Sequence, residues 1–118
     1  MVKKYDIVLI NLDPSKGAEK RGLRPCLILQ NDLANASRLQ TVTVAPFTKH
    51  MRNAPSMQAV KASKDNGMTI DSSLDLSQIR TIDKDRITKI IGRLEVQYWS
   101  DTNDKIINFL DLRNEYLY

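Results

Sequence analysis

Short apolar segments alternate with polar segments that contain glycine or proline along the first 94 residues of the chain. Three runs rich in β-branched and aliphatic residues, 7–10, 26–29 and 41–45, predict buried strands. A strong turn signal, Asp-Asn-Gly, occupies residues 65–67. The same patterns predict four further strands, at 57–60, 68–70, 78–82 and 87–94.

The pattern changes near the end of the chain. Val96, Trp99, Asn103, Ile106 and Leu110 recur at spacings of three and four residues, which is typical of one face of an amphipathic helix. Several short strands followed by one helix predict a mainly β fold, a small antiparallel barrel or curled sheet with the C-terminal helix packed against it. We expect the core to contain Ile7, Leu9, Leu27, Leu29, Val42, Val44, Ile79, Ile106 and Leu110.

Two of the polar segments, 14–24 and 48–55, are basic. The 18 lysines and arginines outnumber the 14 aspartates and glutamates, which gives a net charge of +4 at pH 7 and a pI of about 9.3. This modest excess favours a polyanionic partner without identifying one. Two basic loops beside one sheet predict an electrostatic groove for single-stranded RNA.

The length of 118 residues suits one compact domain, so we expect a single domain over residues 1–118. Cys26, the only cysteine, has no partner for an internal disulfide, which favours a reducing compartment. The apolar run after Lys4 covers only residues 7–10, too few for a signal-peptide core or a membrane span. We therefore expect a cytoplasmic protein with no membrane partner.

The residues available for chemistry exclude several kinds of site. With His50 as the only histidine and one cysteine, a zinc site or a catalytic triad is hard to assemble. No glycine-rich phosphate loop occurs, and no paired carboxylates of a magnesium nuclease are evident, although Asp71 and Asp75 remain a chance pair. We therefore expect no metal and no cofactor, and catalysis that depends on arginine, threonine, serine or glutamate.

Three blocks of the chain resemble the MazF/PemK/Kid family of toxins. The first runs from Asp6 as D-I-V-L-I-N-L-D-P-S-K-G-A-E and continues from Arg21 as R-G-L-R-P-C-L-I-L-Q-N-D. The second is V-A-P-F-T, which ends at Thr48, and the third is Q-I-R-T-I-D, which begins at Gln78. Each block alone is a weak motif, but the three stand in family order at family spacing over nearly the whole chain.

The resemblance implies a fold, an activity and partners. The fold would be an SH3-like barrel assembled as a two-fold homodimer. The activity would be that of the toxin of a type II toxin–antitoxin system: a metal-independent, sequence-specific endoribonuclease, or mRNA interferase, acting on single-stranded RNA. The attack of the RNA 2′-hydroxyl on the adjacent phosphate would leave a 2′,3′-cyclic phosphate and a 5′-hydroxyl. An acidic, MazE-like antitoxin peptide would be the protein partner.

The same resemblance assigns site residues. Arg24 matches the family arginine before proline and is our candidate for stabilising the transition state, since its guanidinium stays charged and can hold two phosphate oxygens. Thr48 matches the family threonine or serine, whose hydroxyl would bond the phosphate or position the nucleophile. The candidate substrate-binding residues are Glu19, Lys20, Asn31, Ser77, Gln78 and Arg80.

The chain departs from the family pattern at several of these positions. Ser77 stands where some relatives carry a carboxylate, Ala18 where some carry a histidine, and Lys20 where glutamine is usual. A mechanism with a carboxylate base at position 77 is therefore in doubt, and which groups act as acid and base is left open. Asn31 is as well suited to shaping a turn, and Arg80 to pairing with a nearby carboxylate.

Two other functions stay open. A toxin of the same fold that poisons gyrase would bind a protein instead of cutting RNA, since a fold does not fix a function. A family member that binds RNA or an antitoxin without cleaving is the other, kept open by Ser77. The retained Arg24-Pro25 pair and Thr48 favour the ribonuclease.

Overall fold

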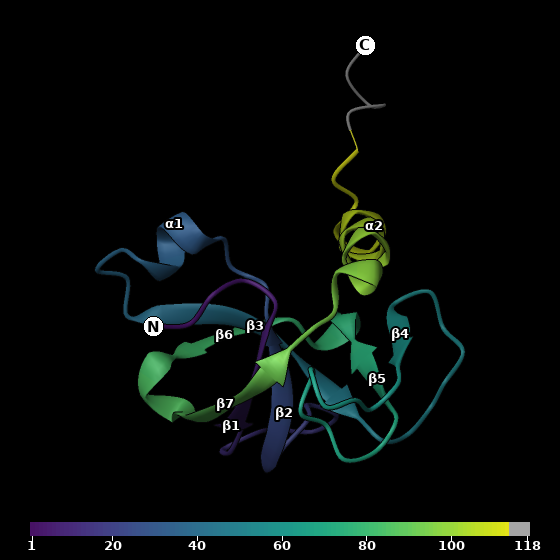
Figure 1. Ribbon diagram of the computed structural model, residues 1–118, viewed down its shortest axis with the longest axis horizontal. Coiled ribbons are helices and arrows are strands. Elements are labelled where there is room, and N and C mark those ends of the chain that lie inside the picture. The colour runs from purple at the N-terminus through teal and green to yellow at the C-terminus, as the bar shows by residue number, and fades with distance from the viewer. Residues whose placement is uncertain (114–118) are drawn as a thin grey trace.

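The computed structural model describes residues 1–113, which form a mainly β fold with a C-terminal helix (Figure 1). The fold class predicted from the sequence is confirmed, as a curled sheet that does not close. The strands are β1 (Asp6–Asn11), β2 (Leu23–Ile28), β3 (Thr41–Thr48), β4 (Met57–Val60), β5 (Ser72–Asp75), β6 (Arg80–Asp83) and β7 (Ile87–Arg93). The helices are α1 (Asp32–Asn35) and α2 (Trp99–Leu110), and the 3-10 turns are η1 (Leu76–Gln78), η2 (Lys84–Arg86) and η3 (Val96–Tyr98).

Strand β3 organises the sheet. The strand order is β4-β5-β3-β2-β1-β7, with β6 also paired to β3, and every pairing is antiparallel. One edge of β3 therefore pairs with β2, while the other edge pairs with β6 over its first half and with β5 at its end. As a result, the β5–β6 turn, which contains η1, runs beside the middle of β3.

Each face of the sheet has its own hydrophobic core. Successive side chains of a strand point to opposite faces and therefore belong to different cores. Ile7 belongs to a core cluster that includes Leu27, Phe47 and Leu74 and that packs against Trp99 and Ile106 of α2. The next residue, Val8, belongs to a second cluster, on the other face. The second cluster consists of Val2, Val8, Ile10, Leu12, Cys26, Ile28, Val42, Val44 and Ile82.

Helix α2 packs against β4 and the η1 turn (Figure 1). The rings of Trp99 and Tyr5 stack with centroids 4.2 Å apart, and the Trp99 indole donates a hydrogen bond to the Leu94 carbonyl at 2.9 Å. Thr102, which is fully buried, donates its hydroxyl to the side-chain oxygen of Gln58 at 2.6 Å. These polar contacts fix the rotation of an otherwise apolar helix face.

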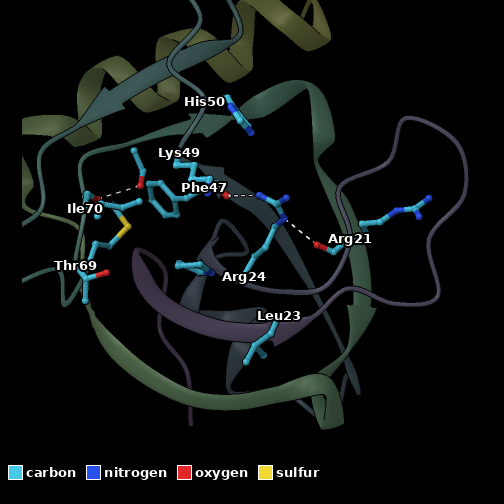
Figure 2. Close-up of a pocket in the computed structure, with 11 residues that line it drawn as sticks. Arg21, Leu23, Arg24, Phe47, Lys49, His50, Thr69 and Ile70 are labelled. Atoms are coloured by element: carbon cyan, nitrogen blue, oxygen red, sulfur yellow. Dashed lines mark hydrogen bonds between the residues drawn. The ribbon is translucent and has the colours of Figure 1, made fainter.

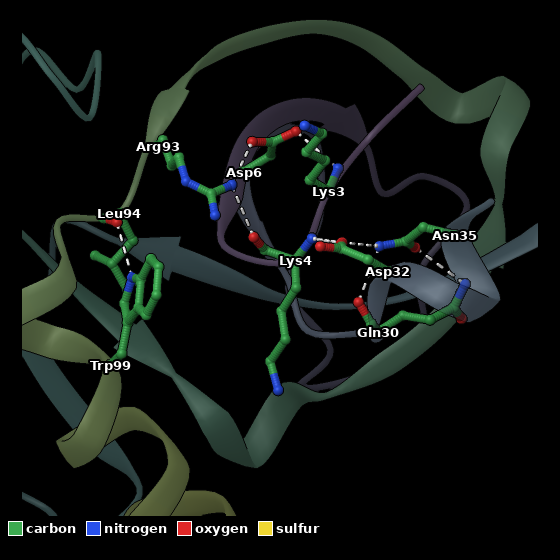
Figure 3. Close-up of polar contacts among 9 residues, drawn as sticks. All are labelled: Lys3, Lys4, Asp6, Gln30, Asp32, Asn35, Arg93, Leu94 and Trp99. Atoms are coloured by element: carbon green, nitrogen blue, oxygen red, sulfur yellow. Dashed lines mark hydrogen bonds and ion pairs between the residues drawn. The ribbon is translucent and has the colours of Figure 1, made fainter.

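Polar contacts also tie the N-terminal segment to α1 and β7 (Figure 3). The backbone N–H of Lys4 donates to Asp32 Oδ1 at 2.7 Å, and Arg93 pairs with Asp6 at 3.2 Å. The hydrogen bond from Lys4 holds the pKa of the Asp32 carboxyl below its usual value. The N-terminus is thereby held at the opposite end of the sheet from the two basic loops, which lie before β2 and after β3.

Several sequence-based expectations were wrong in detail. Residues 68–70 form no strand, and the strand here is β5, which begins at Ser72. The sequence pattern missed β5 because three of its four buried residues are polar (Ser-Ser-Leu-Asp). Val96 precedes α2 and is 69% exposed, and Leu110 is 48% exposed rather than core. The other expected core residues are buried (Ile7, Leu27, Val42, Val44) or partly buried (Leu9, Leu29, Ile79, Ile106). Within residues 1–113, no helix has the length and apolar character needed to cross a bilayer.

Candidate active site at the ends of β2 and β3

Arg24 and Thr48 occupy neighbouring strands at the same end of the sheet. The β2–β3 register pairs Cys26 with Pro46, and continuing it by two residues places Arg24 opposite Thr48. Residues directly opposite in an antiparallel pair point to the same face. The two candidate catalytic residues therefore share one face of the sheet. They lie where the loop between β1 and β2 leads into β2.

The Arg24 guanidinium is held by two backbone carbonyls. Its Nε donates to the carbonyl of Arg21 at 2.9 Å, and its Nη1 reaches the carbonyl of Phe47 at 3.4 Å (Figure 2). These contacts orient the side chain while, among the described residues, the remaining guanidinium N–H groups stay available to a ligand. An oriented, partly exposed arginine is suited to hold a phosphate with little further ordering.

Thr48 is buried, at 2% exposure. Its Oγ1 accepts a hydrogen bond from the backbone N–H of His50 at 3.2 Å, so the hydroxyl proton is left to donate elsewhere. The side chain thus offers a hydrogen-bond donor whose oxygen is fixed by its own chain.

A pocket of about 290 Å³ opens beside Arg24 (Figure 2). Its lining combines apolar side chains with cations from both basic loops. The lining residues are Arg21, Leu23, Arg24, Pro25, Phe47, Lys49, His50, Met68, Thr69, Ile70 and Ser72. An apolar lining with cations beside it is the arrangement that holds an unstacked nucleobase and its phosphates.

The loop between β1 and β2 is fastened to the β5–β6 turn. The backbone N–H of Lys20 donates to Gln78 Oε1 at 3.2 Å, and Lys20 Nζ lies 3.8 Å from a carboxylate oxygen of Asp75. Arg80 contacts the hydroxyl of Ser15 in the same loop at 3.5 Å, and not a nearby carboxylate. The structure thus brings Lys20, Gln78 and Arg80 together from positions some 60 residues apart in the sequence.

Two other expected site residues have local partners. Ser77 donates its hydroxyl to Asp75 Oδ1 at 2.6 Å, which joins it to the group around Lys20. Glu19 accepts the backbone N–H of Lys16 at 2.5 Å and closes a turn within the exposed loop. Glu19 therefore shapes the loop that carries Lys20.

Asn31 lies apart from this group. It caps α1 by accepting the backbone N–H of Ala34 at 2.8 Å, which is the turn-shaping role that its residue type favours. It stands seven residues beyond Arg24 along an extended segment, roughly 20 Å at the usual rise per residue. The structure does not place it with the other candidates.

Burial and charge act in opposite directions on Cys26. Burial raises the pKa of its thiol to about 12, against smaller lowering effects of Arg24 and Arg80. Both guanidinium groups therefore lie near enough to act on the buried thiol, on the face that carries Thr48. The thiol itself stays protonated and is a packing residue of the second cluster.

Within residues 1–113, no group of three or more histidine, cysteine, aspartate or glutamate side chains is arranged to hold a metal. The two aspartates considered as a chance pair have separate partners. Asp71 accepts the backbone N–H of Ala62 at 2.8 Å, whereas Asp75 faces Ser77 and Lys20.

Sequence reasoning missed part of the site. Met68, Thr69 and Ile70 line the pocket from the segment that was expected to be a strand, and Phe47 lies beneath them as part of the first core cluster. No local pattern marks these residues, because the pocket forms only when the segment before β5 folds against the ends of β2 and β3. Of the residues that line the pocket, Phe47 in the Val-Ala-Pro-Phe-Thr block was the one whose type pointed to a hydrophobic surface near Thr48.

Comparisons with known proteins identify the family of this chain. The model of the PemK-like, MazF-like toxins of type II toxin–antitoxin systems matches residues 3–110. Endoribonuclease EndoA of Bacillus subtilis (strain 168) is 38% identical over 96 residues, which cover 80% of this chain and 82% of EndoA.

Solved structures give the same result. The Mycobacterium tuberculosis toxin MazF-mt6 superposes with a TM-score of 0.78 at 27% identity, covering 92% of this chain and 98% of that one. An endoribonuclease in complex with its cognate antitoxin, from a mycobacterial species, shares the fold with a TM-score of 0.79 at 18% identity, covering 96% and 98%. This chain therefore belongs to the PemK-like, MazF-like toxin family of type II toxin–antitoxin systems.

Proposed function

We propose that this toxin is an endoribonuclease that cuts single-stranded messenger RNA at a short recognition sequence without a metal ion. The observation that carries the proposal is the oriented Arg24 guanidinium, which lines a pocket of apolar and cationic side chains beside the end of β3, where Thr48 lies. In this reaction the RNA 2′-hydroxyl attacks the adjacent phosphorus. The 5′-oxygen leaves, which yields a 2′,3′-cyclic phosphate and a 5′-hydroxyl.

The two residues divide the work at the phosphate. Arg24, already oriented by the carbonyls of Arg21 and Phe47, binds the non-bridging oxygens and offsets the charge that grows on the phosphorane. Thr48 donates its hydroxyl proton to one of the same oxygens, because its own oxygen already accepts from His50. Together they align the phosphate for in-line attack. The nucleophile is part of the same RNA strand, so this alignment contributes much of the rate enhancement.

The surrounding residues bind the rest of the strand. The pocket over Phe47 and Met68 accepts one unstacked base next to the scissile phosphate. Lys20, Gln78 and Arg80 extend the surface along the loop between β1 and β2, with Ser77 beside them and Glu19 shaping the loop. Base specificity would then come from the pocket and from this loop, while the cations supply affinity.

The partners of the proposal follow from the family. An endoribonuclease with this fold has been solved in complex with its cognate antitoxin, and we infer that an acidic, MazE-like antitoxin segment covers the basic surface of this toxin. We further propose that residues 1–118 act as a single toxin domain, that two copies form a homodimer, and that the toxin works in the cytoplasm, where messenger RNA is found.

Cleavage of a long, mostly unstructured RNA by the purified protein in excess EDTA tests the proposal. We expect discrete cuts at a shared short sequence, with 2′,3′-cyclic phosphate at the upstream ends, because the reaction uses the RNA's own nucleophile. End mapping identifies the sequence, and phosphatase resistance of the 3′ ends identifies the cyclic phosphate. Intact RNA under these conditions, at a protein concentration that saturates RNA binding, would contradict the proposal.

Replacing Thr48 separates its hydroxyl from its bulk. We expect Thr48→Ala to lower kcat by about a hundredfold, the usual cost of one hydrogen-bond donor in a transition state. Thr48→Ser keeps the hydroxyl and should retain activity within about tenfold of the wild type. The measurement is single-turnover cleavage of an oligonucleotide that contains the mapped site. Equal rates for the two variants would show that the hydroxyl has no part in the reaction.

A further inference from the structure

A buried carboxylate lies beside the candidate site and is unused by the mechanism above. Asp75 ends β5 and is 1% exposed. Its Oδ1 accepts from the hydroxyl of Ser77 at 2.6 Å and from the backbone N–H of Ser77 at 3.1 Å. Its Oδ2 lies 3.8 Å from the ammonium of Lys20. The carboxylate thus joins the β5–β6 turn to the loop between β1 and β2.

Capping a 3-10 turn does not explain the burial. Asp83 does the same job for η2, accepting the backbone N–H of Asp85 at 2.8 Å, and it does so at the surface and forms no ion pair within residues 1–113. Burying a carboxylate is costly unless hydrogen bonds and an opposite charge offset the loss of water. Asp75 has both, from Ser77 and Lys20, and each of these side chains reaches the surface.

The sheet register places this group next to Arg24 and Thr48. Thr48 pairs with Ser73 and Phe47 with Leu74, so continuing by one residue sets Asp75 opposite Pro46. Pro46 pairs on its other side with Cys26, which is two residues along β2 from Arg24. Asp75 therefore lies on the face that carries Thr48, one two-residue step along the sheet, roughly 7 Å at the strand rise.

We propose that Asp75 is a positioning residue of the RNA site, which acts through Lys20 and Ser77. It fixes the Lys20 ammonium where a phosphate next to the scissile one passes. It also accepts the hydrogen bond that the Ser77 hydroxyl donates, so that Ser77 presents only oxygen lone pairs to the substrate. Ser77 then recognises a donor on the RNA, a base N–H or a 2′-hydroxyl, and not a phosphate oxygen. This inference rests on the proposed ribonuclease function.

Asp75→Asn distinguishes positioning from a plain charge effect. The variant adds one unit of positive charge near the RNA, which by itself would tighten RNA binding. Loss of the fixed Lys20 should instead lower kcat by about tenfold or more, as small displacements of aligned groups do, while KM stays the same or falls. Asp101→Asn is the matched control, because it adds the same charge on α2, where Asp101 pairs with Lys105.

A double-mutant cycle tests whether Asp75 acts through Lys20. We expect Lys20→Met to lower kcat, and the combined Asp75→Asn, Lys20→Met variant to lose less than the product of the two single losses, since the shared contact is lost in both and only the Ser77 contact adds to the loss. The substrate is an oligonucleotide with the site mapped for the wild type, and its 2′-deoxy form, which cannot be cut, reports binding. Thermal unfolding of each variant shows whether the fold is retained.

The outcomes separate this inference from the function on which it rests. If the wild type cuts RNA and Asp75→Asn matches Asp101→Asn in kcat, Asp75 has no positioning role and the ribonuclease function stands. Additive losses in the cycle would likewise overturn the link to Lys20. If Asp75→Asn unfolds, Lys20→Met and Ser77→Ala break the same contacts from the surface, and wild-type kcat in both would overturn the inference. If the wild type cuts no RNA, both fall.

Discussion

Replacing Arg24 with alanine is expected to abolish RNA cleavage while leaving the fold intact. The structure orients the guanidinium beside Thr48 through the carbonyls of Arg21 and Phe47. Arginines and donors that act on developing negative charge contribute about 10³-fold or more to such reactions. Arg24→Lys should recover little of the rate, because an ammonium cannot make both orienting bonds and hold two phosphate oxygens.

The fold should tolerate the change, because Arg24 is partly exposed and its partners are carbonyls at the edge of the sheet. Arg38→Ala is the matched control, because this substitution removes the same charge. Arg38 is exposed, lies beyond α1 and does not line the pocket. The measurement is single-turnover cleavage beside circular dichroism of both variants. A folded Arg24→Ala protein that cuts within tenfold of Arg38→Ala would show that the site lies elsewhere.

Replacing Leu27 with alanine is expected to cause a large loss of stability. Leu27 is fully buried in β2, where it pairs with Ile7 on one side and Ala45 on the other, and it belongs to the first core cluster. A leucine-to-alanine change at such a position costs about 2–5 kcal/mol through lost burial and the cavity left behind. For a domain of this size the melting temperature should fall by roughly 10–20 °C.

Leu33→Ala gives the matched control, because Leu33 on α1 is 86% exposed. Its free energy of unfolding should stay within about 0.5 kcal/mol of the wild type. Urea unfolding followed by tryptophan fluorescence is a suitable measurement, since Trp99 packs on the same cluster. If both leucine variants unfolded at the same urea concentration, the core assignment of β2 would be wrong.

The two residues that we propose as catalytic could be named from the sequence. Arg24 and Thr48 stand in two recognisable blocks, each at the end of a strand whose apolar residues show up in the sequence. The antiparallel pairing of β3 with β2 then brings the two blocks to the same end of the sheet, and the alternation of side chains along each strand places Arg24 and Thr48 on one face. The grouping of the candidate substrate-binding residues was less predictable, because Lys20, Gln78 and Arg80 meet only when a loop folds across to the β5–β6 turn.

By itself the sequence determined the strand-rich fold class, the C-terminal helix and the residues of the Arg24–Thr48 pair, since each depends on local periodicity or on a short motif. Only the tertiary structure decided the rest. Strand β5 is polar in sequence and is a strand because its backbone pairs with β3 and β4. The pocket over Phe47 and the burial of Asp75 likewise depend on contacts between distant segments. The free energy of such contacts depends on what packs against a residue, which its sequence neighbours do not specify.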